Sequence, residues 1–241
     1  MKDVFIMQGN KAAGKDIVAR YLRYLIGTPS WMHKYWIGRL LSWIPFRSKM
    51  KITRYAQALK EVLSVMLRVP VERFEDRDFK EHHFVDFNNY KIYDDRKTTV
   101  PKTISDKSFV RHLSYDDLEV AKKYNLSVRQ VLQVWGTNIC RRFLGDKLWI
   151  NMTFGQEPHN LIIADQRFII ENEVTSKMKN AIIIHITRPD MPISQHPSEK
   201  ELETLLAKKK YDYLIENDGT LKDLFNKVKE LYYFNLIWTV Q

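Results

Sequence analysis

The chain has 241 residues, of which 44% are hydrophobic and 28% are charged, and its formal net charge is +10. This composition is that of a globular protein, and it excludes wholesale disorder and a collagen-like or proline-rich chain. A single cysteine, Cys140, excludes an intrachain disulfide and a cysteine-based zinc site, so we expect a reducing compartment such as the cytoplasm.

The positive charge is concentrated in one stretch. Between Ile17 and Lys60 the chain has no aspartate or glutamate, but it has nine lysine and arginine residues. Such a field attracts anions, which leaves a nucleotide, a nucleic-acid backbone and an anionic membrane open as partners. The same charges can also simply keep in solution a surface that carries Trp31, Trp36 and Trp43. No apolar stretch approaches the ~20 residues of a membrane span.

The first half of the chain opens on a strand and a helix joined by a glycine-rich turn. Apolar spacing predicts a buried strand at Val4–Met7, followed by a helix at Gly14–Ile26. It then predicts an aromatic and basic insertion helix at Trp31–Phe46, which ends at Pro45, and a further helix at Ala56–Leu67. The polar stretch Val71–Thr103 is expected to be an irregular, loop-rich insertion or lid.

The second half alternates helices with continuous apolar runs. It predicts a helix at Val128–Leu144, interrupted near Gly136, a strand at Asn160–Asp165 and a helix at Phe168–Met178. Two strands, Ala181–Ile186 and Tyr213–Ile215, and a closing helix, Leu221–Tyr232, follow. This pattern indicates an α/β fold, a parallel sheet flanked by helices. We expect a single domain over residues 1–241, with insertions at about 28–52 and 71–126, and ligands at the carboxyl ends of the strands.

A phosphate-binding loop is predicted directly after the first strand. The residues match the pattern G-x-x-x-x-G-K: Gly9, Asn10, Lys11, Ala12, Ala13, Gly14 and Lys15. The glycines let backbone N–H groups point at phosphate oxygens, the following helix adds its positive end, and Lys15 reaches the β- and γ-phosphates. A chance match in a strand-to-helix turn is the competing interpretation, but the expected strand and helix flank the loop.

Asp16 stands where a serine or threonine hydroxyl usually contacts Mg²⁺. A carboxylate can hold this metal directly or through water, because Mg²⁺ prefers oxygen ligands. Its negative charge beside phosphates needs an offset, which Lys11 can supply.

A second signal lies on the helix that Ser127 is placed to cap. Arg129 and Gln133 fall four residues apart on one face, with Cβ atoms ~5–6 Å apart. Arginine offers a planar fork for a phosphate, and glutamine offers a donor and an acceptor for a nucleobase edge. Beside a phosphate loop we interpret the pair as a site for a nucleoside monophosphate, although an ordinary solvated helix has the same pattern.

Charged residues also follow two later strands. Asp165 ends one strand, where a phosphate-loop fold places the acid that holds Mg²⁺ through water. It could equally cap the next helix. Arg167 beside it can face the transferred phosphate. Arg188 follows the next strand and can stabilise phosphate charge, or form a plain ion pair.

These motifs resemble those of the bacteriophage deoxynucleoside monophosphate kinases, a branch of the P-loop nucleoside monophosphate kinase fold. The similar stretches run in order over most of the chain: Gly9–Asp16, Ser127–Thr137, Trp149, Ala164–Arg167, His185–Pro189 and Glu216–Leu221. An aspartate after the loop lysine also occurs in that family. The segment 31–50 has no counterpart that we can place.

The resemblance implies a kinase that uses ATP and Mg²⁺ to phosphorylate a deoxynucleoside 5′-monophosphate. Arg129 would then hold the acceptor phosphate, with Gln133 near the base. The remaining acceptor-side residues that it implies are Lys11, Lys60, Arg77, Lys80, Gly136, Thr137, Trp149 and Arg167. It implies a cytoplasmic enzyme (in the host cytoplasm if viral) that can form a homodimer, with no stable nucleic-acid or membrane partner.

Two other functions stay open from the residues. The first is a kinase of the same fold for another small phosphorylated acceptor, resembling dephospho-coenzyme A or phosphomevalonate. The second is a protein that binds a nucleic acid or a membrane surface through the basic, tryptophan-rich stretch.

Overall fold

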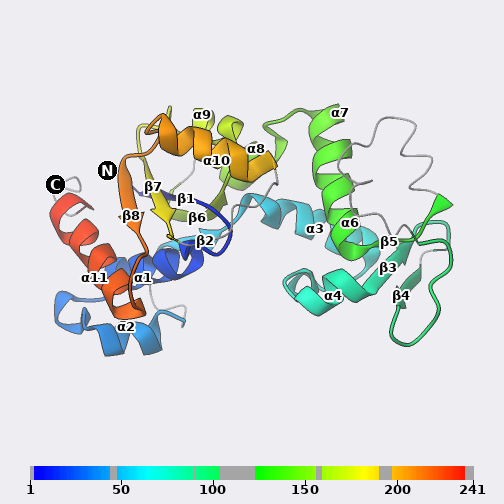
Figure 1. The fold of residues 1–241 in the computed structure, drawn as a ribbon, viewed down its shortest axis with the longest axis horizontal. Coiled ribbons are helices and arrows are strands. Elements are labelled where there is room, and N and C mark those ends of the chain that lie inside the picture. Colours follow the sequence, from blue (N-terminus) through cyan, green and yellow to red (C-terminus); the bar gives the residue numbers. More distant parts are fainter. Residues whose placement is uncertain are drawn as a thin grey trace. The chain divides into compact units, whose positions relative to one another are not determined.

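The computed structural model describes residues 3–43, 48–89, 91–103, 123–155, 159–189 and 197–236. By its contacts the chain divides into two compact units: Met1–Tyr55 with Thr153–Gln241, and Ala56–Met152. Figure 1 shows the elements of both. The second unit includes the whole insertion expected at 71–126 and extends beyond it at both ends.

A five-stranded sheet forms the centre of the first unit (Figure 1). The strands follow one another in the order β2 (Lys51–Thr53), β6 (Leu161–Gln166), β1 (Val4–Gln8), β7 (Ala181–Thr187) and β8 (Tyr213–Glu216). Every neighbouring pair is parallel. All residues of β1 are buried, as expected of a central strand that is covered on both faces. The predicted α/β fold is confirmed, and the short edge strand β2 is an addition to it.

Helices flank this sheet. They are α1 (Lys15–Gly27), α2 (Tyr35–Leu41), α9 (Ile169–Thr175), α10 (Pro197–Ala207) and α11 (Leu221–Leu231). Among them, α2 packs on α1 and α11. The spacing of Val18, Leu22 and Leu25 turns one face of α1 into the core, where these residues share a cluster with Phe225 of α11. Burying each such side chain contributes roughly 1.5–3 kcal/mol to folding.

The aromatic and basic stretch is only partly the helix that we expected. A single 3₁₀ turn, Ser30–Met32, precedes the short helix α2, which ends at Leu41. The expected stop at Pro45 lies outside the described residues. Trp31 and Trp36 are exposed, as is Trp43, over whose ring the Arg20 guanidinium lies 3.8 Å from the centroid.

A buried polar network crosses the three central strands at their carboxyl ends. The Gln8 side chain hydrogen-bonds Nδ1 of His185 at 2.8 Å and accepts from Nε2 of Gln166 at 2.8 Å. Asn172 and Thr175 of α9 complete it by donating to these two glutamines. Because Gln8 precedes the phosphate loop and Gln166 follows Asp165, the network fixes these two segments relative to each other.

The buried histidine of this network makes the free energy of unfolding depend on pH. Burial and then the charge of Lys15 lower the pKa of His185 from 6.5 to about 4. The unfolded chain therefore binds a proton below pH 6.5 that the folded chain binds only near pH 4, so stability falls as the pH drops through this window, by up to ~3 kcal/mol.

Urea unfolding between pH 7 and pH 4 checks this, with His185→Gln as the matched variant. The variant keeps a hydrogen-bonding amide but has no group that titrates, so we expect its stability to fall less over the same range. Parallel profiles for the two proteins would show that His185 does not contribute.

The second unit is built on the long helix α3 (Tyr55–Leu67), which starts in the first unit. Among its described residues, the other α-helices and strands are α4 (Arg77–His82), β3 (His83–Asp86), β4 (Lys91–Asp94), β5 (Leu126–Ser127), α6 (Val128–Gln133), α7 (Arg142–Leu144) and most of α8 (Leu148–Phe154). The three strands form an antiparallel sheet in the order β4–β3–β5.

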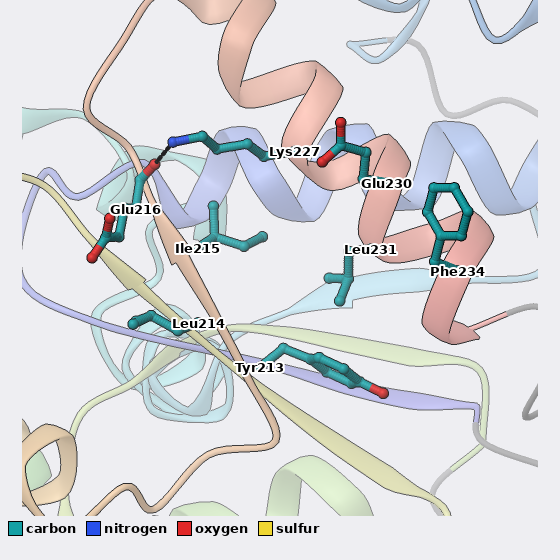
Figure 2. A pocket seen from close by; sticks show the side chains of 8 residues that line it. All are labelled: Tyr213, Leu214, Ile215, Glu216, Lys227, Glu230, Leu231 and Phe234. Carbon is teal, nitrogen blue, oxygen red and sulfur yellow. Dashed lines mark hydrogen bonds between the residues drawn. The ribbon is translucent and has the colours of Figure 1, made fainter.

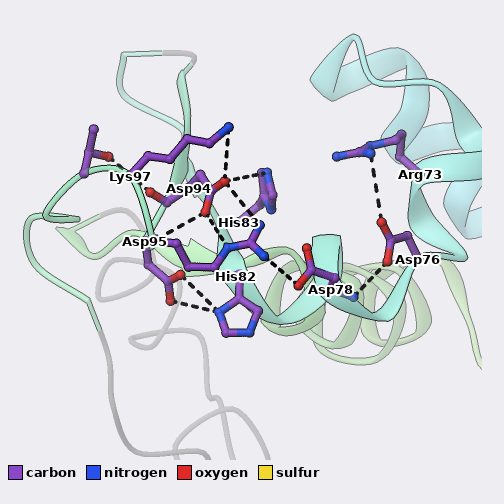
Figure 3. A network of polar contacts seen from close by, with 10 residues as sticks. Arg73, Asp76, Asp78, His82, His83, Asp94, Asp95 and Lys97 are labelled. Carbon is purple, nitrogen blue, oxygen red and sulfur yellow. Dashed lines mark hydrogen bonds and ion pairs between the residues drawn. The ribbon is translucent and has the colours of Figure 1, made fainter.

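The expectation of an irregular segment at Val71–Thr103 is wrong. This segment forms a 3₁₀ turn, α4 and the hairpin of β3 with β4. Ion pairs and hydrogen bonds surround the hairpin, as Figure 3 shows. Arg96 contacts Asp94 of β4 and Asp78 of α4, and the hydrogen bond from Arg96 lowers the pKa of Asp94 to about 2.

The interruption near Gly136 is confirmed. Between α6 and α7 the helix widens into a π-helix, Val134–Arg141. A Cβ at Gly136 would lie 2.6 Å from Cδ2 of Leu59 on α3, so glycine lets these helices approach closely. Trp149 of α8 donates from Nε1 to the Gly136 carbonyl at 2.8 Å. Trp149 is thus a buried structural contact of this helix.

Candidate active site

The predicted phosphate loop has the backbone that phosphate binding needs. It leaves β1 at Gln8 and enters α1 at Lys15, and positive φ angles at Gly9 (145°), Ala12 (63°) and Gly14 (105°) curl it. A Cβ at Gly9 would lie 2.1 Å from the Ile186 carbonyl oxygen on β7, so only glycine fits there. No side chain among the described residues caps α1, which leaves its positive end to the loop.

Lys15 is held inside this loop. It is 6% exposed, and its Nζ donates to the carbonyls of Gly9 and Asn10, each at 2.5 Å. Burial and then the charge of Arg167 lower the pKa of Lys15 to about 8, against the opposing charges of Glu199, Asp16 and Asp165. A desolvated ammonium whose hydrogen bonds within the described residues go only to backbone carbonyls is suited to bind an anion.

The two carboxylates predicted to hold a metal both lie within electrostatic range of this lysine. Asp165 is half-buried at the end of β6, and its Oδ1 accepts from the Tyr55 backbone N–H at the start of α3, at 2.9 Å. Asp16 forms an ion pair with Arg54 at 2.6 Å. Arg54 therefore offsets the negative charge of Asp16, a role for which the sequence suggested Lys11. Both carboxylates interact electrostatically with Lys15.

The carboxylate at the start of α9 is Glu171, whereas the sequence also offered Asp165 as the cap of this helix. Glu171 of α9 accepts from the backbone N–H groups of Arg167 and Phe168, at 2.8 and 3.0 Å. This carboxylate therefore satisfies the N-terminal turn of α9. Arg167 is half-buried and close enough to Lys15 to lower its pKa. Arg188 is exposed directly after β7.

A group of basic side chains gathers in the second unit; we call Lys60, Lys80 and Arg129 the cationic cluster. Burial and then the charges of Arg129 and Lys60 lower the pKa of Lys80. Arg129 on α6 donates to Glu81 at 2.5 Å, and buried Lys60 on α3 pairs with Glu75 at 2.6 Å. Three residues that the family resemblance implied are thus brought together around two acids that sequence reasoning missed.

The other predicted acceptor residues differ in their surroundings. Ser127 caps α6 as predicted, in a capping box with Gln130. Gln133, one turn after Arg129, is exposed, and so is Arg77 at the start of α4. The side chain of Thr137 lies outside the described part of the chain. Phe87 and Trp135, which sequence reasoning did not single out, stack at 5.0 Å in the same unit.

A surface pocket lies elsewhere in the first unit. Side chains of β8 and α11, with Phe234, line it, and Lys227 donates to the Glu216 carbonyl at its edge (Figure 2). None of the predicted site residues lines it. Within the described ranges no three acidic, histidine or cysteine side chains gather into a metal site, and no helix there is long and apolar enough to cross a membrane.

A comparison with protein families matches residues 3–228 to the family described as deoxynucleotide monophosphate kinase. The chain belongs to this family. The kinase is therefore a phosphotransferase that acts on nucleotide monophosphates, as the resemblance implied. A comparison with curated proteins finds no match.

Proposed function

We propose that this kinase transfers the γ-phosphoryl group of ATP to a deoxynucleoside 5′-monophosphate and releases ADP and the diphosphate. The observation that carries the ATP part is the desolvated ammonium of Lys15 inside a loop curled by Gly9 and Gly14. The glycine-lined backbone and this single cation suit a polyphosphate. A reducing cytoplasm suits the single cysteine of the chain.

Catalysis of this reaction depends mainly on aligning the two phosphates and neutralising their negative charge. An oxygen of the acceptor phosphate attacks the γ-phosphorus while the bond from the γ-phosphorus to the bridging oxygen breaks, and ADP leaves with that electron pair. Lys15 is the loop's cation toward ATP, and Arg167, close enough to affect its pKa, can face the transferred phosphate. Asp16 and Asp165 suit Mg²⁺ held through water, because this ion needs only one or two carboxylates beside the phosphates. The bound metal would neutralise charge on the β- and γ-phosphates.

The acceptor is assigned to the cationic cluster. Arg129 offers a planar fork to the acceptor phosphate, and Gln133 offers both a donor and an acceptor to the base. The ion pair with Glu81 holds the Arg129 guanidinium in a defined direction before the acceptor binds. Lys60 and Lys80 add positive charge around the same phosphate.

An acceptor panel tests this assignment. Coupled ADP release is measured with dTMP, dGMP, dCMP, dAMP, the matching ribonucleotides, and non-nucleotide phosphates that resemble dephospho-coenzyme A or phosphomevalonate. We expect turnover with at least one deoxynucleotide and none with the non-nucleotides. Turnover with a non-nucleotide alone would contradict the assignment of Arg129 and Gln133.

The pKa of Lys15 gives the binding of ATP a defined pH dependence. In the free protein the pKa is about 8, and a bound polyanion raises it, so binding takes up a proton above this pH. We expect ATP affinity to fall as the pH rises above about 8. Titration calorimetry at pH 8.5 in two buffers of different ionisation enthalpy measures the uptake, and Lys15→Met should abolish it. Equal uptake by the variant would assign the proton to another group.

A further inference from the structure

A carboxylate from a distant part of the chain reaches the phosphate loop. Glu199 lies in the first turn of α10 and is only 4% exposed. Its Oε1 accepts from the backbone N–H of Lys11 at 3.2 Å. Its charge also opposes the fall in the pKa of Lys15, which places the carboxylate within electrostatic range of the ammonium. A buried acid thus interacts with both kinds of donor that the loop offers to a phosphate.

The helix that carries Glu199 is firmly docked. Leu202 and Leu205 of α10 are buried, and Glu201 accepts from the Ile169 backbone N–H at the start of α9, at 2.7 Å. The same short stretch therefore sends one carboxylate to a helix N-terminus and another to the phosphate loop. Both are places where backbone N–H groups favour an anion.

We propose that Glu199 is a displaceable occupant of the phosphate loop. In the nucleotide-free kinase its carboxylate takes the place of a phosphate oxygen at the Lys11 N–H and near Lys15. Two anions cannot share this position, because water screens their repulsion only weakly in a partly buried site. The phosphates of ATP must therefore expel Glu199. This inference rests on the proposed binding of ATP by the loop.

Two consequences follow. The Lys11 N–H keeps a hydrogen-bond partner when no nucleotide is bound, since a partly buried N–H group without a partner is costly. The apparent affinity for a polyphosphate is also lower than the intrinsic affinity. It equals the intrinsic affinity multiplied by the fraction of molecules in which the carboxylate has left the loop. Removing the charge of Glu199 should therefore strengthen binding, which is the opposite of what removing an ordinary binding residue does.

The test is the binding of inorganic tripolyphosphate to the full chain in EDTA, measured by titration calorimetry. Glu199→Gln keeps the shape of the side chain but not its charge, and we expect it to bind about tenfold more tightly than the wild type. Glu199→Asp, which withdraws the carboxylate by one methylene, should also bind more tightly. The matched control is Glu203→Gln, an exposed acid on the same helix, which should leave the affinity unchanged.

The outcomes separate this proposal from the proposed function. Wild-type protein that binds neither tripolyphosphate nor ATP would refute the assignment of the loop itself. Wild-type binding with unchanged or weaker binding by both Glu199 variants would refute the displaceable carboxylate alone. Weaker ATP binding by Glu199→Gln only when Mg²⁺ is present would make Glu199 a residue on the metal side, which also contradicts the proposal. The thermal shift that tripolyphosphate produces should be larger for Glu199→Gln than for the wild type.

Discussion

Replacing Lys15 by methionine is expected to lower kcat by about 10²- to 10³-fold, because it removes a preorganised cation from the charge that develops in the transition state. Coupled ADP release measures this loss. The fold should survive, since methionine keeps the apolar stem of the side chain. The surroundings of Lys15 lower its pKa to about 8, so keeping this amine charged at neutral pH destabilises the folded protein. Methionine removes that destabilisation.

Thermal unfolding is the companion measurement for Lys15→Met. We expect a melting temperature no lower than that of the wild type, even though the hydrogen bonds to Gly9 and Asn10 are lost. The matched control is Lys222→Met, an exposed lysine of α11, which should leave both activity and stability unchanged. Full activity of Lys15→Met would remove the phosphate loop from the mechanism.

Replacing Arg129 by alanine is expected to weaken the use of the acceptor and to spare ATP. The loss of a charge-assisted contact to a phosphate should lower kcat/KM for the deoxynucleoside monophosphate by roughly 10- to 100-fold. The Kd of ATP should stay unchanged, because the proposal assigns Arg129 to the acceptor phosphate and Lys15 to ATP. Initial rates at varied acceptor, with ATP binding measured separately, distinguish the two effects.

Two further variants sharpen this prediction. Arg142→Ala removes an exposed arginine farther along the same helical run and should leave acceptor kinetics unchanged. Glu81→Gln removes the ion-pair partner of Arg129 without touching the arginine, so it should change the acceptor KM and leave the Kd of ATP unaltered. Unchanged acceptor kinetics in Arg129→Ala would show that α6 does not hold the acceptor phosphate.

The parts that the sequence predicted well depend on local rules. The strand, glycine loop and helix around Lys15 lie within one short stretch, so their sequence pattern does not depend on tertiary contacts. Continuous apolar runs predicted the central strands β1, β6 and β7 for the same reason. The break near Gly136 follows from the weak helix propensity of glycine, although its purpose, the close approach of Leu59, depends on tertiary contacts.

The parts that were missed depend on contacts between distant residues. Lys11 and Glu199 are 188 positions apart, and nothing in the pattern around Glu199 marks it as a partner of the loop. Arg54 meets Asp16 only because β2, a strand of three residues, pairs with β6. The hairpin of β3 and β4 escaped prediction because its strands have only four residues each, too few to show an apolar period. The ion pair that links Arg96, just after β4, to Asp78 of α4 leaves no local pattern.

Phosphoryl transfer from ATP labelled with ³²P in the γ-position tests the central claim most directly. The wild-type kinase is incubated with the labelled ATP, Mg²⁺ and each of the four deoxynucleoside monophosphates, and the products are separated. We expect the label in a deoxynucleoside diphosphate, in equal amount to the ADP formed. Label that appears only as inorganic phosphate, or that stays in ATP with all four acceptors, would contradict the account.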